Sequence, residues 1–513
     1  MSGTSQSQAG RLRGLVELAR GALARTDDGA LASRAAAAAL VIRVANAILA
    51  YAAQVVLARL MGQFEYGVFA FTWVWFLVFG SVATLGFTDS AVRYIPMLRE
   101  RGELAELRGF LRLGAGAVIA TATLVGILTA LILPLADGHI ESAYALPMLL
   151  LAVVLPFACL QSFLEGVGRS YFWTVPALAP IYIMRHGLLL VFMLAAVWAG
   201  FEATAKTAFV CVILTVLTSL AYQLTAILRR LRRVLEPGPR AYRPREWILG
   251  SLPFSVMFGA AHLFAFADVL VLSFFVSPAE IAVYFAATRV MQVVALIPFA
   301  ATVGTAQLIA AHHAAGDTDR MRRLIGEITF WTFIIALAVT FLVAVTGDWL
   351  LGLFGAGFHA GYPALLVLAA GMMIKVALGP AEDVLNMTGH SRLSAWTYIV
   401  TILVNVALNV ALIIPFGILG AAMATTLAIA VRSAWLALAA RRRLGVDTWI
   451  LAARPSLLAL RRAAARGEPG RIAAVRDATT PRPMTFLSCS GLTRASRVQA
   501  RRRRSGLSGQ ARQ

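Results

Sequence analysis

Long apolar segments separated by short polar ones run through most of the chain. An α-helix needs about 20 apolar residues to cross a hydrocarbon core of about 30 Å, and these segments have about that length. The alternation of apolar and polar positions that is typical of membrane barrel strands is absent. The pattern therefore predicts an all-α polytopic membrane protein. About twelve transmembrane helices are expected, at residues 36–60, 67–87, 110–135, 143–164, 172–198, 204–228, 247–276, 281–306, 326–346, 361–382, 393–414 and 418–440.

The composition agrees with a membrane protein. Hydrophobic residues make up 59% of the chain and charged residues 14%, and the mean hydropathy is +0.77. Soluble domains carry nearer 25% charged residues. The three cysteines, Cys159, Cys211 and Cys489, have no spacing that indicates a disulfide framework or a metal site.

Arginines divide the connecting loops into two classes. Every second loop is basic, with Arg93, Arg169 and Arg392 among its members, and the central loop 229–246 is the richest. The loops between them, such as GQFEYG, DGHIES and SPAE, contain no lysine or arginine. The positive-inside rule then predicts that both termini are cytoplasmic. The net charge of +21 is explained by this basic inner face, so no nucleic-acid partner is expected.

The loop 229–246 divides the spans into two sets of six. We expect a basic amphipathic segment at 1–35 without a signal-peptide core, an N-terminal bundle at 36–228, the basic linker 229–246, a C-terminal bundle at 247–440, and an Arg-rich, disordered tail at 441–513. Within residues 55–71 and 271–287, Glu65 matches Glu280 and Val68 matches Val283 at an offset of 215, and residues 200–210 match 417–427 at an offset of 217. Two nearly equal offsets predict a parallel repeat, with a substrate site between the bundles.

Several stretches resemble a known family. LARLMGQFEYGVFAF and LGFTDSAVRYIP resemble the first two spans of the polysaccharide flippases, similar to Wzx, in the multidrug/oligosaccharidyl-lipid/polysaccharide exporter superfamily. The run NVALNVALIIPFGILGAAMATTLA supports the same resemblance in the second half. The resemblance implies two six-helix bundles around a V-shaped cavity with alternating access. It also implies export of undecaprenyl-diphosphate-linked oligosaccharide across the bacterial inner membrane during O-antigen or exopolysaccharide synthesis, with polymerases and glycosyltransferases as partners.

Cationic residues inside the spans are the candidate substrate ligands. Arg185 lies about 13 residues into its span, which is ~20 Å along a helix and too deep to reach water easily. Arg289, Lys375 and Arg43 lie at other depths in both halves. Guanidinium groups suit diphosphate oxygens, so these four residues are predicted to line one cationic cavity. The alternatives are structural: Arg289 could pair with Asp268, Glu382 could neutralise Lys375, and Arg43 could reach the inner interface.

Other polar residues have less definite candidate roles. Asp268, His186 and His262 are candidates for coupling transport to a proton or sodium gradient, or for a salt bridge. Arg93, Glu382 and Asp383 are candidates for an inner gate. No metal and no cofactor is expected. Trp73, Trp75 and Phe76 are candidates for sugar contact, although packing explains them equally well.

Two other functions are alternatives to the flippase. A cation-coupled multidrug exporter of the same superfamily would have a more acidic cavity. A membrane glycosyltransferase using a polyprenyl carrier would need a catalytic domain or a large acidic outer loop, which the sequence lacks, so no enzyme is expected. No phosphate-binding loop of the nucleotide-hydrolase type is present, which argues against ATP as the driving force.

Overall fold

The computed structural model describes residues 28–136 and 142–452, and these residues form helices and connecting segments without any strand. The predicted features of residues 1–27 and of the tail beyond 452 lie outside the described residues. The α-helices are α2 (Asp28–Ala83), α3 (Phe87–Glu100), α4 (Leu104–Ile132), α5 (Ala145–Ser170), α6 (Thr174–Ala179), α7 (Arg185–Trp198), α8 (Ala205–Val234), α9 (Pro244–Leu272), α10 (Pro278–Ala314), α11 (Thr318–Gly352), α12 (Tyr362–Ala377), α13 (Ala381–Met387) and α14 (Ser391–Leu444). Short 3₁₀ turns are η1 (Leu133–Ala136), η2 (Ser142–Tyr144), η4 (Ala356–Gly361) and η5 (Ile450–Ala452), and η3 (Pro180–Met184) is a π-helical turn.

The predicted all-α membrane fold is confirmed. In the described part of the chain, ten helices are long and apolar enough to cross a membrane. Two of them, α2 and α14, each contain two of the predicted spans, joined at a non-helical glycine: Gly62 with φ 74° and Gly417 with φ 54°. Only glycine adopts these backbone angles without strain, so the two glycines allow the chain to reverse direction within a few residues.

The internal repeat also has a structural counterpart. Gly200 and Gly417, which the offset of 217 residues pairs, both have positive φ and both precede the last span of their half. In the other matched pair, residues 55–71 and 271–287, α2 and α10 pack closely, since a Cβ on Gly67 would lie 1.7 Å from the carbonyl oxygen of Pro278. The division into bundles at 228 and 247 stays a prediction.

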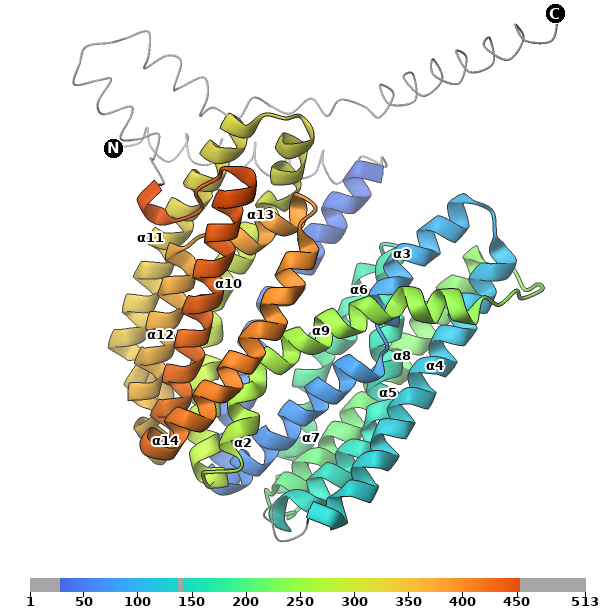
Figure 1. The fold of residues 1–513 in the computed structure, drawn as a ribbon. Helices are drawn as coiled ribbons and strands as arrows, with labels where there is room; N and C mark the ends of the chain where they lie inside the picture. The colour runs from blue at the N-terminus through green and yellow to red at the C-terminus, as the bar shows by residue number, and fades with distance from the viewer. Residues whose placement is uncertain (1–27, 137–141, 453–513) are drawn as a thin grey trace, which may run out of the picture. The chain divides into compact units, whose positions relative to one another are not determined.

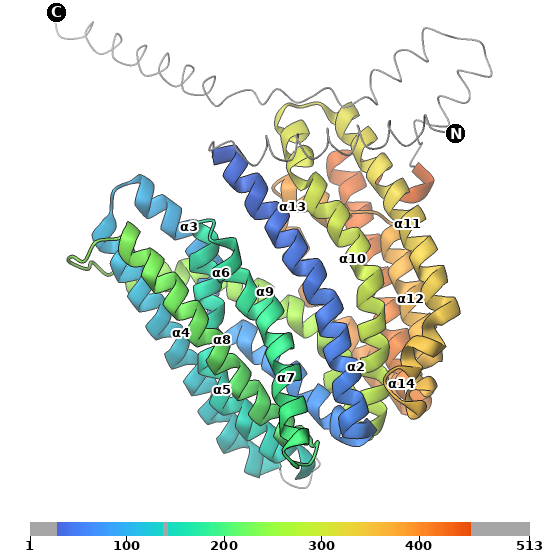
Figure 2. The ribbon, with the colours of Figure 1, turned by 180° about the vertical axis from the view of Figure 1, so that it is seen from behind.

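Helix α9 connects the two sets of helices. Figures 1 and 2 show α4, α5 and α8 side by side in one group and α11, α12 and α14 in another, with α9 reaching from one to the other. Near its start, the buried Trp247 packs edge-on against Phe110 of α4 at 5.5 Å between ring centres. Its later part packs along α14. The first turns of α9 are thus anchored on the N-terminal helices.

The predicted linker is more ordered than a free loop. Arg108 of α4 donates hydrogen bonds to the carbonyl oxygens of Glu236 and Pro239, and Arg243 pairs with Glu106 at 2.6 Å. Residues 235–243 therefore lie against the start of α4. The linker sequence alone did not reveal this, because the partners, Glu106 and Arg108, belong to α4 and two of the contacts use backbone carbonyls.

The predicted disordered tail begins too early at residue 441. Helix α14 continues to Leu444, and the next residues pack beneath the C-terminal helices. Thr448 is 1% exposed, donates to the carbonyl oxygen of Leu378 at 2.8 Å and accepts from Thr329 at 3.0 Å. Its hydroxyl group satisfies a carbonyl oxygen at the break between α12 and α13, and its own carbonyl oxygen accepts from α11.

Candidate functional site

A cavity of about 500 Å³ is lined by helices from both halves of the chain, namely α2, α3, α5, α7, α9 and α10, together with the π-turn η3. It contains three of the four cations predicted as substrate ligands: Arg43, Arg185 and Arg289. His186 and His262 line it as well. The structure therefore brings five of the candidate residues together in one region.

Arg185 is buried deeply, as its position in the span indicated. It follows the π-turn η3 and donates its backbone N–H to the carbonyl oxygen of Pro180. The side chain is 8% exposed and donates from Nη2 to Oε1 of Gln161 at 2.8 Å. Its Nε has no partner among the described residues. A π-turn inserts an extra residue into the helix and changes which face the following side chains occupy, and such turns are frequent at functional sites.

Arg43 and Arg289 are held by aromatic rings. The Arg43 guanidinium lies 5.0 Å from the ring centre of Tyr182 and 5.4 Å from that of Phe299. Arg289 lies 4.0 Å over the ring of Phe285, and its Nε and Nη2 are shielded from solvent without a partner in the described structure. Cation–π contacts hold a guanidinium in place while they leave its N–H donors free.

Sequence analysis missed a charged network at one wall of this cavity. Arg169 of α5 pairs with Asp89 of α3 at 2.8 Å and lies 3.9 Å from Glu165, which is 7% exposed. Gln161, Glu165 and Arg169 follow each other at four-residue intervals along one face of α5. That spacing is a sequence signal, since such residues share a helix face, but the predicted span ends at residue 164 and so left Glu165 and Arg169 in a loop.

The cavity carries excess positive charge. Four arginines line it, the three predicted ones and Arg169, against two acids, Asp89 and Glu165. Buried polar groups in proteins are nearly always hydrogen-bonded. Arg185 and Arg289, each with N–H groups that lack a partner among the described residues, line this positively charged cavity, and its charge favours an anionic ligand.

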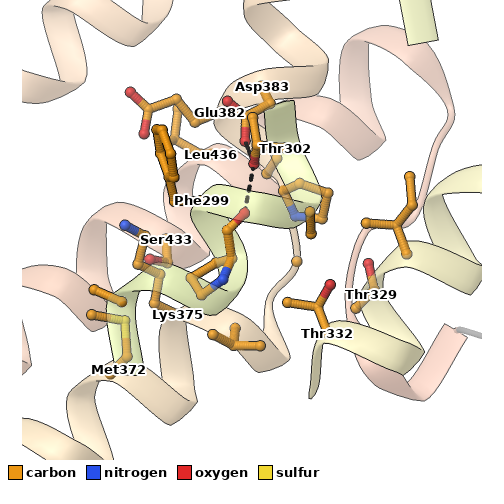
Figure 3. A pocket seen from close by; sticks show the side chains of 18 of the residues that line it. Phe299, Thr302, Thr329, Thr332, Met372, Lys375, Glu382, Asp383, Ser433 and Leu436 are labelled. Atoms are coloured by element: carbon orange, nitrogen blue, oxygen red, sulfur yellow. Dashed lines mark hydrogen bonds between the residues drawn. The ribbon is translucent and has the colours of Figure 1, made fainter. Parts of the chain in front are cut away.

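Lys375 does not lie in this cavity. It lines a separate cavity of about 250 Å³ within the C-terminal helices, together with Glu382 and Asp383 (Figure 3). Asp383 accepts a hydrogen bond from Thr302 at 2.9 Å, and its burial raises the pKa of its carboxyl group above its usual range. The single cavity with four predicted cations is corrected to one with three, because α12 faces α10, α11 and α14 rather than the N-terminal helices.

The acids of the two ion pairs considered as structural alternatives have other partners. Glu382 pairs with Arg432 at 2.8 Å, not with Lys375, and Arg432 stacks 3.7 Å over Tyr398. Among the described residues Asp268 has no ion pair with Arg289. It accepts hydrogen bonds from Tyr284 and Thr425 instead. Tyr284 and Arg289 are five residues apart on α10, about 140° around the helix, so they face different neighbours.

The remaining candidates are peripheral or make local contacts. His186 and His262 each lie close to the carbonyl oxygen four residues earlier in their own helix, at 3.4 and 3.0 Å. Arg93 is exposed on α3, and its guanidinium lies 5.7 Å from the ring centre of Tyr94.

The aromatic cluster of the second span divides between two regions. Trp73 and Phe76 line the cavity, whereas Trp75 belongs to a separate apolar pocket with Phe71 and Phe79. Two of the three predicted sugar-contact candidates are therefore placed beside the arginines.

Comparisons with known proteins agree with the resemblance. The MatE family model matches residues 253–411. The chain is 25% identical over 176 residues to the probable low-salt glycan biosynthesis flippase Agl15 of Haloferax volcanii, a match that covers 34% of this chain and only 37% of that relative.

Solved structures share the fold. An inward-facing multidrug resistance MATE family transporter of the MOP superfamily aligns with a TM-score of 0.64 at 14% identity, over 80% of this chain and 98% of the other. The lipid II flippase MurJ in an inward closed conformation aligns with a TM-score of 0.61 at 13% identity, over 78% of this chain and 87% of the other. Together, these findings agree with the resemblance: a family model and a curated relative match parts of the chain, and solved transporters and flippases share its fold.

Proposed function

We propose that this chain is a flippase that carries a polyprenyl-diphosphate-linked oligosaccharide across a membrane by alternating access, as part of glycan assembly. The observation that supports this most is the set of cavity arginines whose donors lack partners, above all Arg185 and Arg289. A diphosphate diester has acceptor oxygens and negative charge for these groups, and guanidinium groups bind phosphate oxygens in a planar, bidentate geometry.

The cavity arrangement suggests how the cargo is held. The diphosphate binds between Arg185 on α7 and Arg289 on α10, so a single headgroup contacts helices of both halves. The sugars then lie toward Trp73 and Phe76, which line the same cavity. Arg43 adds charge from α2. The basic side of the helices is the cytoplasmic side in this proposal, and loading takes place from there.

Contacts at the other side keep the two halves together in the arrangement described. Arg59 near the Gly62 turn donates to the carbonyl oxygens of Leu353 and Gly352, and Tyr51 donates to that of Leu350 at 3.2 Å. These contacts join α2 to the end of α11. Transport requires them to break, and in this proposal a proton or sodium gradient, acting through Asp268 and its partners, contributes to the cycle.

The multidrug exporter differs from this proposal in the charge of its cargo. A cationic drug would meet four arginines and two acids in the cavity, which is unfavourable. The discriminating experiment measures binding of a short-chain prenyl diphosphate and of a lipophilic cation to the purified chain in detergent. We expect saturable diphosphate binding that weakens with ionic strength and with Arg289→Met. Preferred binding of the cation would contradict the proposal.

A further inference from the structure

An aromatic turn joins α5 to α6 on the basic side of the helices. Tyr171 and Trp173 stack with their ring centres 4.6 Å apart and an interplanar angle of 14°. Between them, Phe172 has φ 56° and is 56% exposed. A large residue other than glycine is rarely found in this left-handed region, and such strained positions cluster at ligand-binding and switching sites. The turn thus holds Phe172 outward at the end of the spans.

Two arginines from other helices enclose this aromatic stack. Arg99, at the end of α3, lies 4.8 Å from the ring centre of Tyr171, and Arg230, near the end of α8, lies 5.9 Å from that of Trp173. Both arginines are exposed. The contacts in the order Arg99, Tyr171, Trp173 and Arg230 join the ends of three helices, α3, α5 and α8. The rings support the guanidinium groups from one side and leave their N–H donors available.

The arginines at the ends of α3 and α8, unlike Arg169 at the end of α5, have no acidic partners in the described part of the chain. Among the described residues, none of the six arginines at these two helix ends forms an ion pair, whereas arginines elsewhere on the same side do, for example Arg243 with Glu106. Glu100 and Glu103 are close in sequence but do not pair with them. The six are Arg99, Arg101, Arg229, Arg230, Arg232 and Arg233.

We propose that this aromatic–arginine surface, formed by Arg99, residues 171–173 and Arg230, docks the headgroups of anionic phospholipids. An exposed aromatic side chain at a span end inserts at the level of lipid headgroups, and unpaired arginines beside it attract their phosphates. A zwitterionic lipid offers a phosphate but cancels its charge, so the surface selects for net negative headgroups. The inference rests on the membrane location of the helices and is independent of the cargo.

The test uses the full chain in vesicles that contain a photoactivatable phosphatidylglycerol in a phosphatidylcholine background. Mass spectrometry measures cross-linking to the peptide around 170–174. The variant is Arg99→Gln with Arg230→Gln, and the matched control is Arg320→Gln with Arg322→Gln. The control arginines are exposed but already paired, with Asp317 at 3.3 Å and Asp319 at 3.6 Å. All four substituted positions are exposed, and an unchanged thermal transition in detergent confirms that each variant folds.

Each arginine near a membrane surface contributes roughly a five-fold effect on attraction to anionic lipid. We therefore expect the Arg99/Arg230 variant to lose about ten-fold or more of the preference for phosphatidylglycerol over a photoactivatable phosphatidylcholine, and the control to keep it. Phe172→Ser should weaken cross-linking of both lipids. An equal loss in the control, or no preference in the wild type, would overturn the proposal, since the attraction would then come from the basic side in general or be absent.

Discussion

Replacing Arg185 by methionine tests whether this residue binds the transported ligand or stabilises the fold. Arg185 is almost fully buried and forms one side-chain hydrogen bond, to Gln161 at 2.8 Å, with no acid within salt-bridge distance among the described residues. Burial of a charge without an ionic partner is costly, because no counter-ion offsets the loss of its hydration. Arg185→Met should therefore leave the free energy of unfolding unchanged or raise it.

Arg185→Met should weaken binding of the diphosphate even though it does not reduce stability. A hydrogen bond to a charged partner contributes about 1.5–3 kcal/mol, so loss of one such bond to a phosphate weakens binding by roughly ten- to 150-fold. Gln161 keeps its own hydrogen bond to Ser219, at 2.9 Å, so the neighbouring wall of the cavity should persist.

Arg169→Met provides the matched control. It removes a cation of the same cavity that is paired with Asp89 and near Glu165, and so leaves those acids without a partner. Because the Arg169 and Asp89 side chains are 33% and 28% exposed, the expected loss of stability is reduced, to about 1–3 kcal/mol.

The two variants are compared by thermal unfolding in detergent and by calorimetric titration with a prenyl diphosphate. If Arg185→Met destabilises the chain as much as Arg169→Met and leaves binding intact, Arg185 is structural and the reasoning is refuted.

Four further predictions address other parts of the molecule. Arg59→Gln removes donors to the end of α11, so labelling of cysteines introduced beside Gly62 should increase several-fold; unchanged labelling would contradict a closing role. Gly67→Ala places a methyl group against the carbonyl oxygen of Pro278 and should cost about 1–3 kcal/mol in thermal unfolding, whereas no loss would show that the helices separate easily. Asp268→Asn should abolish any stimulation of transport by an imposed gradient, and persistent stimulation would exclude this residue from coupling. Burial raises the pKa of Asp383 above its ordinary value of 3.8. The wild type should therefore lose stability as the pH rises from 3.8 through the pKa of the folded state. Asp383→Asn should make the temperature of thermal unfolding less dependent on pH in this range.

Much of the fold could be predicted because the bilayer restricts the choices. Apolar length determines the spans, and the arginines mark one side of them. The duplicated motif even identified Gly200 and Gly417 as equivalent positions, and both have the positive φ of a reversal. The predicted spans end at residues 87 and 382, a few residues beyond the ends of α2 at Ala83 and α12 at Ala377, because apolar length alone does not show where a helix stops.

The sequence predicted which buried cations belong to a polar cavity, but not which residues contact them. A cation in an apolar run must find a polar environment, so Arg185 and Arg289 could be assigned to a cavity from their depth. Which neighbours they meet depends on helix rotation, which single spans do not reveal. Lys375 was therefore grouped with residues of another cavity. The alternative that Asp268 pairs with Arg289 also depended on helix rotation, and Tyr284 and Thr425 contact Asp268 instead.

Transport in proteoliposomes tests the central claim most directly. The measurement follows transbilayer movement of a fluorescent undecaprenyl-diphosphate oligosaccharide with the wild type, with Arg185→Met and Arg289→Met, and with the surface control Arg320→Gln. We predict rapid movement with the wild type and the control, and movement near that of protein-free vesicles with the two cavity variants, all four proteins being folded. Equal movement with all four would show that the cavity arginines do not carry the diphosphate, and no movement with the wild type under an imposed proton or sodium gradient would contradict the flippase itself.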